Sequence, residues 1–443
     1  MSKATTSGPI GISLTTATAI VVSNMIGTGV FTSLHFQVGP LPSGFVILML
    51  WLVGGVCALC GALAYGELAA ALPRSGGEYH FLAKAFHPAV GFLAGWLSAT
   101  VGFAAPIAAA AMAFGKYFAD VVPGASPLVL SLVIAALVTL VHLRGAELGA
   151  VFQNGATALK VALIVVFIVA GIFVKPVAGV SFAPHPGAMD MILSPPFAFS
   201  LVFVMYAYSG WNAATYIVGE VRDPSRNVPL AITLGTFIVA ALYLALNATF
   251  LRVAPMAELG AEGKFEVGYT AAAHIFGEAG GRIMAGLICL GLVASISAMT
   301  WIGPRVSMTM GEDHRLLAPL ARKSRAGVPI VAMWLQLAFV AVLLLTATFD
   351  QIINYVQFSL TLCSMLAVIG VFVLRVRQPD LPRPYRTWGY PVTPLIFLAI
   401  SAWMLVFTWQ QHRHESLAGL GTLLLGLVLY FVSPKTKPEP SIP

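Results

Sequence analysis

The sequence has very few charged residues for its length, since they make up only 9% of 443 residues while hydrophobic residues make up 58%. Soluble globular domains carry about 25% charged residues, so this chain lacks the polar surface that a water-soluble fold needs. Cysteine is scarce as well. The four cysteines all fall inside apolar runs, and we expect packing roles for them rather than a disulfide framework or a metal site. The composition predicts one integral membrane domain.

Long hydrophobic runs take the place of polar surface. Because crossing about 30 Å of hydrocarbon takes roughly 20 apolar residues, run length and Gly/Pro punctuation predict an all-α protein with about twelve transmembrane helices. We expect helices near residues 11–38, 41–72, 87–121, 127–143, 151–174, 191–219, 227–251, 279–310, 328–347, 352–376, 391–410 and 416–433. Residues 1–443 then form a single transmembrane domain, with residues 434–443 as a cytoplasmic tail.

Most of the 24 basic residues fall in loops on one side of these helices. With the N-terminus in the cytoplasm, the inside loops hold Lys3, Arg74, Lys84, Arg144, Arg222, Arg226, Arg315, Arg322, Lys323, Arg325, Arg375, Arg377, Arg383, Arg386, Lys435 and Lys437. The positive-inside rule therefore predicts that both termini are cytoplasmic. The net charge of +7 is explained by this topology, and we expect no nucleic-acid partner.

Glycine interrupts two of the expected helices at similar depth. Gly27 and Gly29 in the first helix each weaken helix propensity by roughly 1 kcal/mol, and Gly210 lies among small and polar groups in the sixth. The breaks are five helices apart, and a repeat of five helices must re-enter the membrane from the opposite side. We therefore expect a 5+5 inverted repeat over residues 11–175 and 191–377, followed by two peripheral helices over 391–433.

Paired breaks at the bilayer midplane predict a binding site for a small molecule. Unpaired backbone is tolerated at that depth only where it is buried or lines a cavity. The freed N–H groups of Gly27, Thr28 and Gly29 suit a carboxylate, and the freed carbonyls near Tyr206 and Ala207 suit an ammonium group. Close helix packing by glycine is the alternative, which the pairing of the two breaks disfavours.

Four segments, in order and at helix boundaries, resemble one family. They are Ile26–Phe31 in the first helix, the loop Pro73–Tyr79, the stretch Glu220–Ile232 after the sixth helix, and Arg375–Pro391 late in the chain. Together they are similar to signatures of the amino acid–polyamine–organocation superfamily, and the last segment resembles its L-type amino acid transporter branch in particular.

The resemblance implies a leucine-transporter-type fold with discontinuous helices 1 and 6. It also implies secondary active transport of an amino acid by alternating access, with the substrate carboxylate at the first break and the amine at the second. Tyr206 would occupy the aromatic gate position, with Trp211 further along. The substrate-binding residues implied are Ile26, Gly27, Thr28, Gly29, Tyr206, Ala207, Ser209, Asn212 and Ser295.

Two departures from the family pattern narrow the expected substrates and partners. Branch members that accept cationic amino acids can carry an acid where this chain has Ser209, so we expect neutral L-amino acids, with a cationic or other amine substrate as the alternative. The loop over residues 120–126 has no cysteine of the kind that joins animal L-type proteins to a glycoprotein subunit. We expect no disulfide-linked heavy subunit, no cofactor, and a place in the bacterial inner membrane.

Lys160 lies about nine residues into the fifth hydrophobic run, roughly 13 Å along the helix. A charge at that depth costs about 2.5 kcal/mol or more and is a functional candidate, whereas a lysine nearer the interface would snorkel. In several family members, a lysine here resembles a tethered substitute for the sodium ion between helices one and eight. The resemblance therefore implies sodium-independent exchange or proton-coupled uptake, with Lys160 as the coupling residue.

Charged residues near cytoplasmic helix ends are candidates for a gate. Glu67, Glu220 and Arg226, together with Arg74 and Arg222, could form a network that closes the inner side, although a solvated role in orientation is the alternative.

Two other classes of function lack their sequence features. A channel favours charged rings or a filter loop, and an intramembrane enzyme needs an acid/base or metal cluster. His35 and His142 fall in unrelated segments, while His412 and His414 are interpreted as polar linkers. We expect neither enzymatic activity nor a bound metal.

Overall fold

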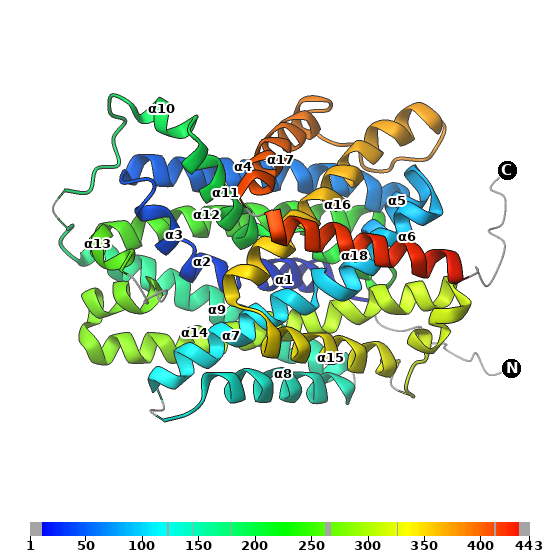
Figure 1. Ribbon diagram of the computed structural model, residues 1–443, viewed down its shortest axis with the longest axis horizontal. Helices are drawn as coiled ribbons and strands as arrows, with labels where there is room; N and C mark the ends of the chain where they lie inside the picture. Colours follow the sequence, from blue (N-terminus) through cyan, green and yellow to red (C-terminus); the bar gives the residue numbers. More distant parts are fainter. Residues whose placement is uncertain are drawn as a thin grey trace, which may run out of the picture.

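The computed structural model describes residues 11–121, 124–144, 146–177, 179–261, 267–325, 327–411 and 413–433. Long helices lie side by side along the length of the molecule (Figure 1). Within the described ranges, the β-structure consists of two isolated β-bridges. The all-α fold class is confirmed. The expected tail over residues 434–443 lies outside the described residues.

The first half of the chain forms the helices that were expected there, two of them in several pieces, and one further short helix, α5, that was not expected. In chain order they are α1 (Leu14–Met25), α2 (Gly29–Thr32), α3 (His35–Val38), α4 (Gly44–Ala71), α5 (Glu78–Ala85), α6 (Pro88–Leu97), the π-helix η1 (Ser98–Gly102), α7 (Ala104–Val121), α8 (Pro127–Leu143) and α9 (Ala146–Phe173). The expected third helix therefore contains a π-helical turn, which precedes Pro106.

The second half begins with a short surface helix and ends with two helices beside α16. Its elements are α10 (Ala188–Ile192), α11 (Pro195–Tyr208), the 3₁₀-helix η2 (Ala213–Glu220), α12 (Pro224–Val253), α13 (Met256–Leu259), α14 (Val267–Asp313), η3 (Arg315–Ala321), α15 (Ile330–Thr346), α16 (Phe349–Arg377), α17 (Val392–Gln411) and α18 (Arg413–Val432). The helix expected to begin near residue 279 starts earlier, at Val267, and bends at Gly277, where φ is +75°.

Several helices are long and apolar enough to cross a membrane. Among the described residues there are seven such segments, and further apolar helices of 10–17 residues accompany them. Large aliphatic side chains point outward from α8, α9 and α14, as Leu137, Val166 and Ile283 do with more than half of their surface exposed. Lipid is the solvent that covers such a surface. The count of twelve crossings stays a prediction.

Both predicted breaks are present. The first helix stops at Met25 and resumes at Gly29, and the sixth stops at Tyr208 and resumes as η2 at Ala213. Gly210 has φ of +92°, a left-handed conformation that glycine adopts without steric cost. The two discontinuities were predicted from glycine alone, and they are confirmed.

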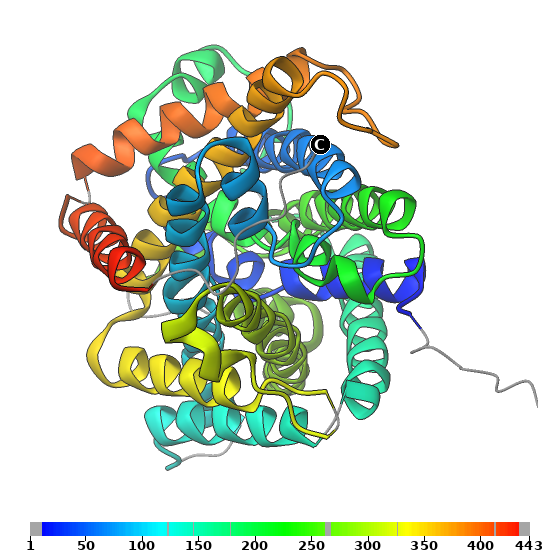
Figure 2. The ribbon, with the colours of Figure 1, turned by 90° about the vertical axis from the view of Figure 1, so that its right-hand side faces the viewer.

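The broken helices lie inside the bundle. α1 packs against α9, α12 and α14, while α4 packs along α12, the helix expected at the corresponding position of the second repeat. Figure 2 shows the bundle turned by 90°, so that many of its helices are seen end-on. The repeat boundaries at 11–175 and 191–377 stay a prediction.

The first and last described segments meet at one end of the bundle, which we call the terminal end and which lies to the right in Figure 1. Backbone and side-chain contacts across this end connect α1, η2, the loop before α5, the end of α14 and the end of α18. They are Ile12–Glu220, Gly219–Ser75, Arg74–Asp313 and His314–Ser433.

Candidate functional site

The two breaks enclose a cavity of about 80 Å³ together with α7, α16 and the start of α5. Since a single water needs about 10–15 Å³ of such space, the cavity has room for a small polar molecule. Most of the predicted site residues line it. They are Gly27, Thr28, Gly29, Tyr206, Ala207, Ser209, Trp211 and Asn212.

The first break supplies backbone groups to the cavity. The Gly27 N–H donates to the Met25 carbonyl at 2.8 Å, so the turn itself uses one of the amides expected to meet a carboxylate. Thr28 and Gly29 lie at the start of α2, and their role toward a carboxylate stays a prediction. The Thr28 hydroxyl lies 3.4 Å from the hydroxyl of Tyr206, which brings the expected gate residue against the first break.

The two breaks touch each other at Gly29. A Cβ atom built on Gly29 would lie 2.5 Å from the Cα of Ala207, closer than side-chain atoms approach. The hydroxyl of Tyr243 on α12 donates to the carbonyl of Met25 at 2.8 Å and lies 3.1 Å from the carbonyl oxygen of Ala207. Tyr243 therefore joins the two breaks, and the sequence interpretation did not identify it.

This contact predicts that Gly29→Ala reduces transport by at least about tenfold, because the methyl group must push the two breaks apart and overpacking of this kind costs about 1–3 kcal/mol. Uptake by reconstituted protein measures the effect. Gly39→Ala is the matched control, since a Cβ at Gly39 meets nothing within 4 Å. Equal uptake by the two variants would refute a functional role for the contact.

The second break is held by its own polar groups. The Ser209 hydroxyl donates to the Tyr206 carbonyl at 2.7 Å, and the Asn24 amide donates to the Gly210 carbonyl at 3.3 Å. Trp211 packs edge-on against Tyr65, with ring centroids 4.7 Å apart. These contacts fix the unwound segment beside the cavity, and its side chains form part of the cavity lining.

Glu78 is a lining residue that the sequence interpretation missed. Its carboxylate is buried and accepts hydrogen bonds from the Tyr65 hydroxyl at 2.8 Å, from the Asn212 amide at 2.7 Å and from the Tyr216 hydroxyl. Among the described residues, these neutral donors rather than a cation hold it. The expectation of neutral substrates was drawn from Ser209 and did not take this buried carboxylate into account. The acid follows Gly77 directly, in a motif that served only to support the family resemblance.

Lys160 is held inside the bundle instead of snorkelling. Its ammonium donates to the Ile26 carbonyl at 2.6 Å, to the Ser23 carbonyl at 3.3 Å and to the Ser295 hydroxyl at 2.7 Å, and the residue is 3% exposed. The Ser295 hydroxyl also lies 2.7 Å from the Ile26 carbonyl. The structure thus gathers Ile26 and Ser295 around Lys160, and neither lines the cavity.

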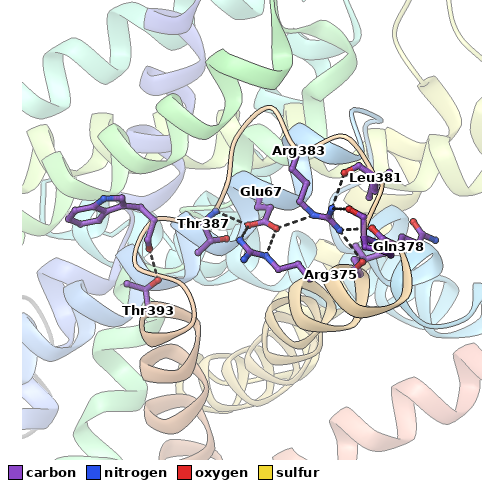
Figure 3. A network of polar contacts seen from close by, with 10 residues as sticks. Glu67, Arg375, Gln378, Leu381, Arg383, Thr387 and Thr393 are labelled. Carbon is purple, nitrogen blue, oxygen red and sulfur yellow. Dashed lines mark hydrogen bonds and ion pairs between the residues drawn. The ribbon is translucent and has the colours of Figure 1, made fainter.

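The expected gating network is divided into separate ion pairs. Figure 3 shows Glu67 between Arg375 and Arg383. Both carboxylate oxygens of Glu67 accept from Arg375, at 2.9 and 2.7 Å, and one of them accepts from the Thr387 N–H at 2.7 Å. Glu67 therefore fastens the loop between α16 and α17 onto α4, and it does not contact Glu220.

The other expected members of that network lie elsewhere. Glu220 pairs with Arg305 of α14 at 3.2 Å, and Arg74 pairs with Asp313 at 2.8 Å. Arg226 is exposed on α12. A closing network was one of two interpretations of these helix-end residues, and Glu67 pairs instead with Arg375 and Arg383 beside the loop over residues 378–391.

In the part of the chain that the structure describes, no three His, Cys, Asp or Glu side chains come together to form a cluster that could bind a metal ion. His412 lies outside the described residues, and His414 is exposed near the start of α18. All four cysteines are buried.

Comparisons with known proteins show the family of this chain. A protein-family model described as "Amino acid permease" matches residues 12–432. The chain is 27% identical to the serine/threonine exchanger SteT of Bacillus subtilis, over 96% of this chain and 97% of that protein. It is 29% identical to the human large neutral amino acids transporter small subunit 2 and 27% identical to the mouse Asc-type amino acid transporter 1, in each case over 95% of this chain and 80% of the relative. The predicted resemblance is confirmed, and this chain belongs to the amino acid permease family.

Proposed function

We propose that this protein exchanges neutral L-amino acids across the bacterial inner membrane by alternating access. The observation that carries the proposal is the cavity between two broken helices, which is lined by the backbone of Thr28 and Gly29 at one break and by Tyr206 and Ala207 at the other. The Ala207 carbonyl accepts one hydrogen bond, from Tyr243, and can accept a second. An amino acid has a carboxylate for the first break and an ammonium group for the second. The relatives whose names include an exchanger and a neutral amino acid transporter support the same choice.

Neutral substrates fit the charges of the cavity. Ser209 brings no carboxylate to the second break, and the carboxylate of Glu78 already accepts three hydrogen bonds from neutral donors. A cationic side chain would therefore find no carboxylate supplied by Ser209 at the second break.

Sodium-independent coupling is supported by Lys160. Its ammonium makes hydrogen bonds to two carbonyls of the first helix and to a hydroxyl of α14, which are oxygen ligands of the kind that a small cation takes. The fixed positive charge then replaces a bound ion between these two helices. We propose that its contacts change as the helices move, which ties substrate binding to the conformational cycle.

The terminal end is proposed to face the cytoplasm, because the basic loop residues collect there. We also propose that the protein works without a disulfide-linked subunit and without enzymatic activity. The burial of Cys57, Cys60, Cys289 and Cys363 supports the first of these, since none is offered to a partner. Of the loop expected to lack a linking cysteine, residues 122–123 lie outside the described residues.

Uptake into proteoliposomes across a panel of amino acids tests the proposal. We expect saturable uptake of neutral amino acids that is stimulated several-fold by unlabelled substrate inside and is unchanged when potassium replaces sodium. Collapse of a proton gradient separates exchange, which persists, from proton-coupled uptake, which falls. Linear, non-saturating flux would point instead to a channel, and conversion of the substrate would reveal an enzyme.

A further inference from the structure

We infer that Gln357 on α16 recognises the side chain of the substrate and selects neutral amino acids that carry a hydroxyl group. This inference rests on the proposed function and names the class of substrate for the same cavity.

Gln357 lines the cavity and carries a polar atom without a partner. The residue is 4% exposed and lines the cavity, and its Nε2 donates to the Thr361 hydroxyl at 2.9 Å. Its Oε1 is buried and has no hydrogen-bond partner among the described residues. Buried polar atoms are nearly always paired, so an unpaired oxygen on a side chain that lines a binding cavity indicates that a ligand supplies the donor.

The position of Gln357 assigns this donor to the side chain of the substrate. The main-chain groups of an amino acid meet the two breaks, where Asn24 offers another unpaired oxygen, its Oδ1, next to Gly210. Gln357 belongs to a different wall, which α7, α14 and α16 form and which includes Phe103, Met299 and Leu360. A substrate held by its main chain turns its side chain toward this wall.

Apolar and polar groups are mixed on this wall in a way that suits a short side chain with a hydroxyl. A hydroxyl both donates and accepts, so it can satisfy the amide of Gln357 whichever of its two ends faces the cavity. A methyl group of the same size leaves the amide unpaired. The cavity volume of about 80 Å³ favours short side chains. Threonine and serine fit these conditions better than valine and alanine.

The experiment compares wild-type protein with Gln357→Met in proteoliposomes, using kcat/KM for threonine against valine and for serine against alanine. Threonine and valine differ by one hydroxyl in place of a methyl group. We expect the wild-type protein to favour threonine by about tenfold, since one hydrogen bond at an otherwise unpaired buried group contributes about that much. Gln357→Met is expected to lower this ratio about tenfold while valine transport persists.

Gln336→Met is the matched control. Gln336 is also buried, donates to a backbone carbonyl and has an unpaired Oε1, but it does not line the cavity. It should leave the threonine-to-valine ratio unchanged. If Gln357→Met also leaves the ratio unchanged, or if wild-type protein transports both substrates equally well, the inference is overturned while neutral amino acid exchange stands. Absence of any amino acid transport by the wild-type protein overturns the proposed function itself.

A second measurement applies if Gln357→Met loses transport altogether. The thermal stabilisation of the purified variant by threonine and by valine is compared with that of the wild-type protein. A preference for threonine that is present in the wild-type protein and missing in the variant supports recognition by Gln357. An equal preference in the two proteins overturns it.

Discussion

Lys160→Ala is expected to reduce amino acid exchange by about a hundredfold. The substitution removes an ammonium that donates to the Ile26 and Ser23 carbonyls and to the Ser295 hydroxyl. Hydrogen bonds from a charged donor contribute about 1.5–3 kcal/mol each, and the loss of a single one at the upper end of this range accounts for the factor. Exchange of labelled substrate in proteoliposomes at several pH values measures it.

Lys175→Ala is the control, because this lysine is exposed beyond the end of α9. Both variants should elute from size-exclusion chromatography as the wild-type protein does, so that a lost activity is not a lost fold. Wild-type rates and pH dependence in Lys160→Ala would show that the lysine has no part in coupling. Recovery of exchange on addition of sodium would support the proposal that the ammonium replaces a bound cation.

Glu67→Ala is expected to lower the free energy of unfolding by about 3 kcal/mol, the loss typical of breaking a buried ion pair. The substitution leaves the guanidinium groups of Arg375 and Arg383 and the N–H of Thr387 without their shared acceptor. Exchange per folded molecule should remain near the wild-type value, since Glu67 does not line the cavity. Thermal unfolding in detergent and uptake by the same preparation provide the two measurements.

Glu312→Ala serves as the control for Glu67→Ala. Glu312 pairs with Lys323 at 3.7 Å, and both side chains are more than 40% exposed, so this pair contributes at most about 1 kcal/mol. A loss of exchange without a loss of stability in Glu67→Ala would indicate that Glu67 has the gating role expected from the sequence. Equal stability of the two variants would mean that the loop over residues 378–391 is held mainly by other contacts.

The helices and their breaks could be predicted from the sequence because their causes are local. Apolar runs of sufficient length set the helices, and the glycines at 27, 29 and 210 lower helix propensity wherever the chain folds. The early start of α14 at Val267 was missed, because residues near Gly277 are mixed in polarity and the helix continues through the bend.

The partners of charged residues could not be predicted in the same way. Glu67 and Glu220 both lie near helix ends, and only the folded loop after α16 and the position of Arg305 decide which cation each meets. Ser295 was expected at the substrate, but it hydrogen-bonds to Lys160. Such assignments depend on tertiary packing, which residue spacing does not specify.

Part of the missed lining had a readable pattern. Gln357, Thr361 and Ser364 are three and four residues apart on α16, which places them on one face, and all three line the cavity. A polar stripe of this spacing on a membrane helix indicates a face turned to a cavity. Tyr243 was missed as well, although Asn247 lies four residues after it on α12.

The backbone pairing of Ile12 with residues 220–222 has a consequence for biosynthesis. The Ile12 N–H donates to the Glu220 carbonyl, and the Arg222 N–H donates back to the Ile12 carbonyl. These partners are almost half the chain apart, and a chain emerges from the ribosome N-terminus first. The segment that precedes α1 therefore waits for the sixth helix before its backbone is paired. The cavity between the two breaks, although the first broken helix supplies part of its lining, is completed late in synthesis.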